Sequence, residues 1–106
     1  HTPGHYPDSV CYLLDGILFT GDTLFVGRTG RTVSNGSDTR QLYRSVYDTI
    51  LDLPGHTIIY PGHDYGPKMT ISIDENIAIS PLLQAEDEDD FVQRMADYEV
   101  ERTFEN

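Results

Sequence analysis

The chain has 106 residues, which is enough for one domain, and its 38% hydrophobic and 24% charged residues predict a soluble globular fold. Its formal net charge of −11 argues against nucleic-acid binding. It has no apolar run near the roughly 18 residues of a membrane helix, and no signal peptide. A single cysteine, Cys11, excludes an internal disulfide, so we expect a buried inert thiol and a cytoplasmic protein. The chain opens at His1 without an initiator Met, which suggests a fragment of a longer protein.

The first third of the chain predicts a loop, a hairpin and a second, longer loop. Residues 1–8 are rich in Pro and Gly. Residues 9–15 and 17–20 are short apolar runs, and Asp15-Gly16 between them favours the positive φ angles of a hairpin turn. Residues 10–14 and 17–19 are apolar on both faces, which predicts a sheet that is covered on both faces. One cover is the helix that follows, and we expect the other to come from outside these 106 residues. Residues 21–36 contain four glycines and predict a long, functional loop.

A helix is expected next, with Asp38 as its cap and Gln41 three residues later. The apolar residues at helical spacing are Leu42, Val46, Ile50 and Leu53. Pro54-Gly55 ends the helix. Residues 57–60 predict a strand, residues 61–67 a loop and residues 74–79 a short helix or turn. This order of elements is an α/β pattern.

The acidic residues gather at the C-terminal end. From residue 74 onward the chain has 11 Asp or Glu against two Arg. Such a run is typical of a solvated helix face, and carboxylates suit a helix N-terminus. We therefore predict a last helix that begins in this run. Its apolar face consists of Phe91, Val92, Met95 and Tyr98.

Three short motifs place a possible metal ligand beside a glycine and next to an apolar strand. They are TPGH at residues 2–5, TGDT at residues 20–23 and YPGHDY at residues 60–65. Imidazole and carboxylate groups suit zinc or iron(II), and glycine lets the backbone turn sharply at a strand end. Each motif alone is also compatible with a simple turn. Taken together, they predict that metal-binding atoms of His5, Asp22 and His63 lie within about 6 Å of each other.

These motifs, in this order and with Gly-Arg-Thr at residues 30–32, resemble the second half of the metallo-β-lactamase superfamily. The similarity is to the branch of glyoxalase II (hydroxyacylglutathione hydrolase) and persulfide dioxygenase, and it runs from His1 to about Tyr98. The resemblance implies an αββα sandwich, of which residues 1–106 supply the C-terminal portion.

The resemblance also implies roles for single residues. His5 would be a ligand of the first metal, and Asp22 would bridge two metals or bind a lone iron and orient the attacking hydroxide. His63 would be a ligand of the second metal in a hydrolase. In a dioxygenase it would lie next to the ligands without binding the metal. Arg31 would lie near glutathione carboxylates, and Tyr65 would line the substrate pocket.

The chain departs from the pattern of this branch in three respects. The branch usually has Gly-Arg-Thr-Asp-Phe, or Lys-Phe-Tyr in glyoxalase II, whereas here Val33-Ser34 follows Arg31-Thr32, which weakens the case for glutathione recognition. Tyr6 stands where a Thr usually follows the metal-binding His. The His-x-His-x-Asp-His motif of the family's N-terminal half is absent from the 106 residues. We therefore expect the chain alone to bind metal weakly and to be inactive.

For the intact protein, the resemblance implies a metal-dependent hydrolase with one or two zinc ions. It would cleave a thioester such as a hydroxyacylglutathione through a metal-bound hydroxide. One alternative is an iron(II) persulfide dioxygenase that acts on glutathione persulfide. Another is a truncated, non-catalytic chain that dimerises. The expected partners are a small-molecule substrate and either the N-terminal half or a second copy, with no nucleic acid and no membrane.

Overall fold

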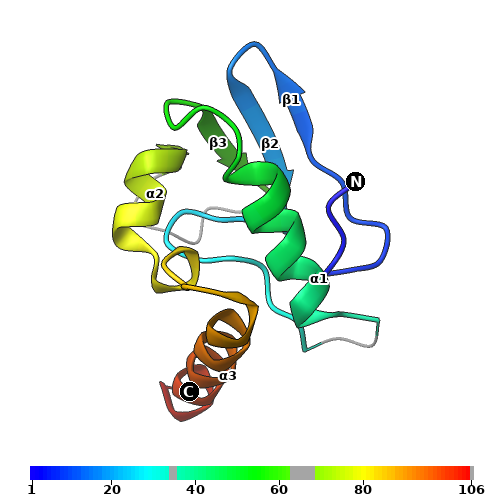
Figure 1. Ribbon diagram of the computed structural model, residues 1–106, viewed down its shortest axis with the longest axis vertical. Helices are drawn as coiled ribbons and strands as arrows, with labels where there is room; N and C mark the ends of the chain where they lie inside the picture. Colours follow the sequence, from blue (N-terminus) through cyan, green and yellow to red (C-terminus); the bar gives the residue numbers. More distant parts are fainter. Residues whose placement is uncertain (34–35, 63–68, 106) are drawn as a thin grey trace.

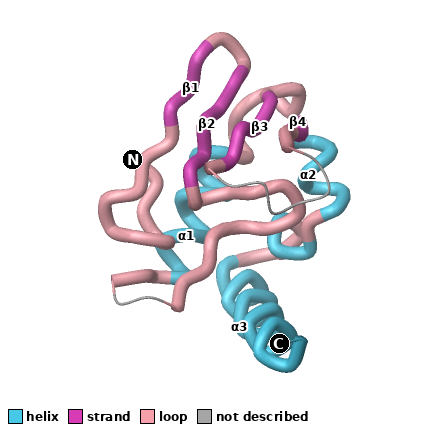
Figure 2. The backbone as a smooth tube through the Cα atoms, turned by 180° about the vertical axis from the view of Figure 1, so that it is seen from behind, coloured by secondary structure: helices cyan, strands magenta, loops and turns pink. Residues whose placement is uncertain are grey.

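A four-stranded mixed sheet forms the centre of the chain. The computed structural model describes residues 1–33, 36–62 and 69–105, with side chains up to residue 100. The strands are β1 (Tyr12–Leu14), β2 (Ile17–Gly21), β3 (Ile58–Pro61) and β4 (Ile71–Ser72), in the spatial order β1-β2-β3-β4. The β2–β3 pair is parallel, and the two outer pairs are antiparallel. Figure 2 shows the four strands side by side.

The predicted hairpin is confirmed. Asp15 and Gly16 join β1 to β2 with φ angles of 47° and 81°, the positive values of a type I′ turn. β1 is shorter than predicted, because it begins at Tyr12 rather than at residue 9. The sequence did not predict β4, whose two residues pair with β3 through Ile59↔Ile71 and Ile58↔Ser72.

The helix predicted after Asp38 is also present. α1 (Thr39–Arg44) begins where the Asp38 side chain accepts the backbone N–H groups of Arg40 and Gln41. It continues into a π-helical segment, Ser45–Ile50, and the N–H group of Leu51 donates to the carbonyl of Val46 five residues earlier. The face that contains Leu42, Val46 and Ile50 is fully buried, as the helical spacing predicts.

Two further helices follow β4. α2 (Ile73–Ile79) has Ser72 as its cap, and a 3-10 turn (Pro81–Leu83) leads to α3 (Glu88–Glu105). α3 begins in the acidic run and buries Phe91 and Met95, which confirms the predicted apolar face. In Figure 1, α3 lies at the end of the molecule farthest from the β1–β2 turn. In the described part of the chain, no helix is long and apolar enough to cross a membrane.

The core lies on one face of the sheet, between the strands and the helices. Leu18, Ile59 and Ile71 from the sheet pack with residues from the π-helical segment, α1, α2 and α3. The loop after β2 also contributes Leu24 and Val26, so this loop is part of the core rather than a solvated connection. The sequence predicted a long, functional loop here and did not predict the burial of Leu24 and Val26.

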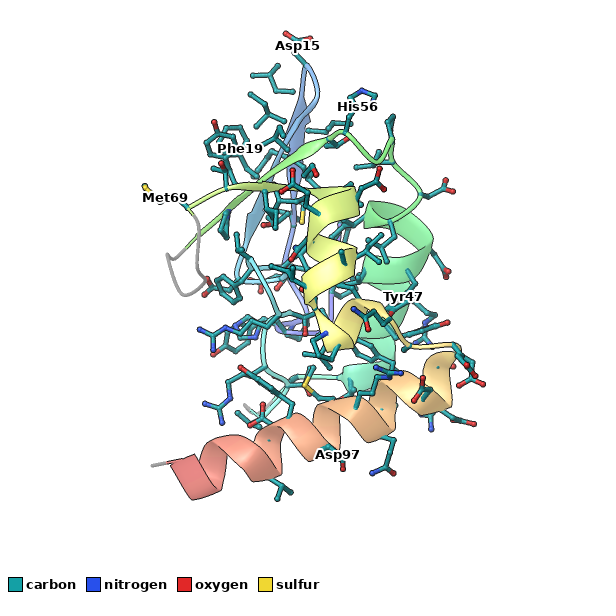
Figure 3. The ribbon with its side chains drawn as sticks, turned by 90° about the vertical axis from the view of Figure 1, so that its left-hand side faces the viewer. Asp15, Phe19, Tyr47, His56, Met69 and Asp97 are labelled. Atoms are coloured by element: carbon teal, nitrogen blue, oxygen red, sulfur yellow. The ribbon has the colours of Figure 1, made fainter. Side chains whose placement is uncertain are left out.

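The opposite face of the sheet is apolar and uncovered by the described residues. Tyr12, Leu14, Phe19 and Tyr60 are exposed, by between 41% and 69%. The strand register places them on one face with Ile17 and Ile58. In Figure 3, Phe19 points away from the helices, whereas Tyr47 lies on the helical side. The sequence predicted that these 106 residues would not supply the cover of the second face, and the described residues cover only one face.

Candidate metal centre

The loop that carries His5 is fixed to the start of α1. Gly4 has a φ angle of 139°, and a Cβ atom built there would lie 2.4 Å from the backbone of Leu42, so only glycine allows this close approach. The N–H group of Asp38 donates to the Gly4 carbonyl at 2.7 Å, and the Ser37 hydroxyl donates to the His5 carbonyl at 2.6 Å. The segment that caps α1 therefore also holds the backbone of His5.

The orientation of the His5 ring follows from one hydrogen bond. Its Nδ1 atom lies 2.5 Å from the backbone carbonyl oxygen of Arg31. Because a carbonyl only accepts, Nδ1 carries the proton, and the neutral ring has its lone pair on Nε2. Nε2 lies 4.0 Å from Oδ2 of Asp22. A backbone carbonyl behind Nδ1 is a common arrangement for histidines that bind metal through Nε2.

Asp22 follows β2 at a local irregularity of the sheet. The register between β2 and β3 shifts between Phe19 and Gly21, which leaves Thr20 as an extra residue. Gly21 then adopts a φ angle of 50°, and the N–H group of Thr23 donates to the Thr20 carbonyl at 2.9 Å. This turn directs Asp22 out of the strand end, where its side chain is 42% exposed.

Two glycines pack directly against the candidate ligands. A Cβ atom at Gly30 would lie 1.9 Å from the backbone oxygen of Asp22 and 3.2 Å from Cγ of His5. A Cβ atom at Gly62 would lie 3.0 Å from Oδ1 of Asp22, and the Gly62 N–H group donates to the Gly21 carbonyl at 2.8 Å. The sequence did not identify Gly30 as a site residue. Its place beside Arg31 in the glycine-rich loop was the available signal.

The structure therefore brings two of the three predicted ligands together. The 4.0 Å between His5 Nε2 and Asp22 Oδ2 is shorter than twice a metal–ligand distance of about 2.1 Å, so one ion can contact both atoms. His63 and Tyr65 lie outside the described residues. Within residues 1–33, 36–62 and 69–100, no group of three His, Cys, Asp or Glu side chains is arranged to hold a metal. The ligand roles of His5, Asp22 and His63 stay predictions.

The Arg31 side chain contacts the C-terminal helix. Its Nη2 donates to Oε2 of Glu99 at 2.7 Å, and its Nε lies 3.1 Å from both carboxylate oxygens. This hydrogen-bonded carboxylate raises the pKa of Arg31 above its ordinary value. Arg28 of the same loop is half-buried and donates to the Tyr98 hydroxyl at 3.0 Å. The sequence carried no signal for Glu99.

Cys11 lies beside the motif that carries His5, with its Sγ 3.2 Å from Oγ1 of Thr2. Burial raises the pKa of the Cys11 thiol, in agreement with an inert side chain, and His56 is exposed in the turn before β3. A cavity of about 310 Å³ lies between the loop and α3, and neither His5 nor Asp22 lines it. Its lining residues are Gly27, Arg28, Pro81, Leu82, Arg94, Asp97 and Tyr98.

Comparisons of the sequence with family models and with known proteins agree on one superfamily. The model of the Metallo-beta-lactamase superfamily matches residues 1–63. The chain is 37% identical to the mitochondrial persulfide dioxygenase ETHE1 of Mus musculus over 84 residues, which are 77% of this chain and 33% of that protein. It is 34% identical to the probable polyketide biosynthesis zinc-dependent hydrolase BaeB of Bacillus velezensis over 91 residues, which are 86% of this chain and 40% of that protein.

A solved structure extends the likeness to the fold. The crystal structure of ETHE1 from Myxococcus xanthus superposes with a TM-score of 0.82 at 39% identity, and the match covers 90% of this chain and 42% of that one. The chain thus spans well under half the length of the relatives that it matches.

Proposed function

Because the chain belongs to the metallo-beta-lactamase superfamily, we propose that it supplies His5, Asp22 and His63 to the metal centre of a hydrolase. The proposed substrate is a thioester such as a hydroxyacylglutathione. The observation that carries the proposal is the pairing of His5 Nε2 with Asp22 Oδ2 at 4.0 Å, with Nδ1 of His5 already bonded to the Arg31 carbonyl. In this arrangement an imidazole lone pair and a carboxylate face the same small volume.

The donor set fits zinc. Imidazole nitrogen and carboxylate oxygen bind zinc at about 2.0–2.2 Å, and the relative BaeB is named as a zinc-dependent hydrolase. Bound zinc supplies a coordinated water whose pKa is lowered towards about 7. We infer that the Asp22 carboxylate orients the nucleophile, since its side chain is open to solvent. The Arg31 carbonyl keeps His5 in the tautomer that presents Nε2.

The proposed substrate contacts come from Arg31 and Tyr65. The Arg31 side chain is 42% exposed, and its carbonyl touches the ring of His5, so the residue lies next to the proposed ligands. A guanidinium there offers N–H donors to polar groups of the substrate. The role of Tyr65 rests on the family resemblance alone.

A second candidate is an iron(II) persulfide dioxygenase. Two histidines and one carboxylate around a single iron leave positions open for oxygen and substrate, and His5 and Asp22 are two of the residue types required. The observation in its favour is the 37% identity to a persulfide dioxygenase, together with the TM-score of 0.82 to the Myxococcus xanthus structure.

One experiment separates the two activities. The full-length protein is loaded with zinc or iron(II) and is assayed for thiol release from a hydroxyacylglutathione and for oxygen uptake with glutathione persulfide. We expect zinc-dependent thiol release, with loss of that activity in Asp22→Asn and retention in His56→Gln, which alters an exposed turn. Oxygen uptake with iron alone would identify the dioxygenase instead. Absence of both activities would refute the proposed enzyme.

A further inference from the structure

The ion pair between Arg31 and Glu99 joins the loop of the candidate site to α3. Glu99 contacts one edge of the guanidinium, with Nη2 at 2.7 Å and Nε at 3.1 Å from its carboxylate. The Glu99 side chain is 19% exposed and that of Arg31 is 42% exposed, so the pair is partly shielded from water. Two-point pairing of this kind fixes the orientation of the carboxylate more closely than the single point charge of a lysine would.

This pair lies beside the proposed ligands. The backbone carbonyl of Arg31 holds the ring of His5, and the preceding Gly30 packs against Asp22. The Arg31 side chain thus leaves the loop at the residue whose own backbone carbonyl contacts His5. An anionic group that approaches the Arg31 side chain would therefore meet a guanidinium that Glu99 already contacts.

We propose that Glu99 is a specificity-determining residue that selects against substrates with a carboxylate at the Arg31 position. This proposal rests on the proposed hydrolase, in which Arg31 faces the substrate. A substrate carboxylate must displace Glu99 or approach it as a like charge, and either event weakens binding. A substrate with a neutral group at that position meets neither obstacle.

The first test removes the charge of Glu99 and compares a charged with a neutral substrate. Glu99→Gln keeps the shape of the side chain and removes its charge. In the zinc-loaded full-length protein, kcat/KM is measured for the acetyl thioester of 3-mercaptopropionate and for that of 3-mercaptopropionamide. We expect the carboxylate-to-amide ratio of kcat/KM to rise about threefold to fivefold in the variant, because a half-exposed pair has modest strength. A ratio equal to that of the unmodified protein, including equal losses for both substrates, would overturn the proposal.

Glu88→Gln is the matched control. Glu88 is also an α3 carboxylate that pairs with arginines, Arg40 and Arg44, and it lies eleven residues from Glu99, or about 16 Å along the helix. The control removes the same charge from the same helix. We expect its carboxylate-to-amide ratio to stay at the value of the unmodified protein. An equal rise in this variant would show a general effect of net charge and would overturn the specific role of Glu99.

A second measurement keeps the proposal testable when no thioester is cleaved. Loss of turnover in every variant would refute the hydrolase, not the role of Glu99. Calorimetry then compares binding of the stable thioethers 3-(ethylthio)propionate and 3-(ethylthio)propionamide. Glu99→Gln should tighten binding of the carboxylate alone by the same threefold to fivefold. An unchanged affinity for the carboxylate would contradict the proposal.

Discussion

The proposed metal ligands depend on backbone atoms around them. His5 presents Nε2 because Nδ1 is bonded to the Arg31 carbonyl, and Asp22 reaches the same place because β2 ends in an irregular turn. Gly30 lies between these two residues and contacts both. The geometry of the pair is therefore sensitive to changes at positions that have no side chain.

Substitution of Gly30 tests this dependence. A methyl group in Gly30→Ala would lie 1.9 Å from the Asp22 backbone oxygen, so the loop must shift away from both proposed ligands. We expect zinc affinity of the full-length protein to fall by about 10–100-fold, as for other changes around metal ligands. Competition with a chelator measures it. Gly16→Ala is the control, because it strains the backbone of the hairpin turn at a φ angle of 81°, where a Cβ atom would have no neighbour within 4 Å. Equal losses of zinc affinity in both variants would show that the effect comes from global instability and not from the site.

The reactivity of Cys11 follows from its burial. Burial raises the pKa of this thiol, and hydrogen bonds with Thr2 and Thr23 offset only part of that rise. Less thiolate is therefore present at pH 8 than in a free cysteine, and thiolate is the reactive form. We expect iodoacetamide to modify the native protein more slowly than the unfolded protein at this pH. Equal rates, followed by mass spectrometry, would contradict the assignment of an inert thiol.

Among the structural elements, α2 fixes the loop after β2. Asn76 of α2 is fully buried, and its side-chain NH₂ group donates to the Phe25 carbonyl at 2.9 Å. Its side-chain oxygen accepts from the N–H group of Gly27 at 2.8 Å and from the Ser80 hydroxyl at 2.9 Å. A buried amide with these partners holds the loop against the helix.

Removal of this amide should destabilise the fold. Asn76→Ala removes the partner of the buried Phe25 carbonyl and of the part-buried Gly27 N–H group. Loss of a buried partner costs about 1–3 kcal/mol for each group. We expect the free energy of unfolding to fall by about 2–4 kcal/mol, measured by urea denaturation. Gln84→Ala, which removes an exposed amide after the 3-10 turn, should cost less than about 0.5 kcal/mol. A loss of that small size for Asn76→Ala would contradict the structural role.

The sequence predicted the elements whose signals are local. Asp38 as a cap, Asp15-Gly16 as a turn and the spacing of Leu42, Val46 and Ile50 all depend on neighbours along the chain, and each is confirmed. β4 escaped prediction because two residues carry no periodicity, and they form a strand only through pairing with β3. The roles of Glu99 and Gly30 were also not predicted, because the residues that they contact are distant in sequence.

At the scale of the whole molecule, the uncovered face of the sheet is the main feature. Six apolar residues of β1, β2 and β3 share this face: Tyr12, Leu14, Ile17, Phe19, Ile58 and Tyr60. A contiguous apolar surface of this kind marks a contact with another part of a protein or with a second copy. We propose that the N-terminal half of the sandwich or a second copy of the chain covers it.

A charged residue placed on this face tests whether a second layer covers it. Phe19→Glu in the full-length protein would bury a carboxylate under the second layer, so we expect the free energy of unfolding to fall by about 2 kcal/mol or more. Thermal unfolding measures the loss. Val100→Glu is the control, because Val100 is similarly exposed on α3 and lies outside the apolar face. Equal, small effects of the two substitutions would indicate that Phe19 stays in contact with water.

The central claim is that His5 and Asp22 bind one metal ion. The direct measurement is the zinc affinity and zinc content of the full-length protein, determined by chelator competition and by elemental analysis, for His5→Ala, Asp22→Asn and the control His56→Ala. We predict that both substitutions in the site lower affinity by at least about 100-fold, whereas the control keeps the affinity of the unmodified protein. Unchanged affinity and content in His5→Ala or Asp22→Asn would contradict the claim.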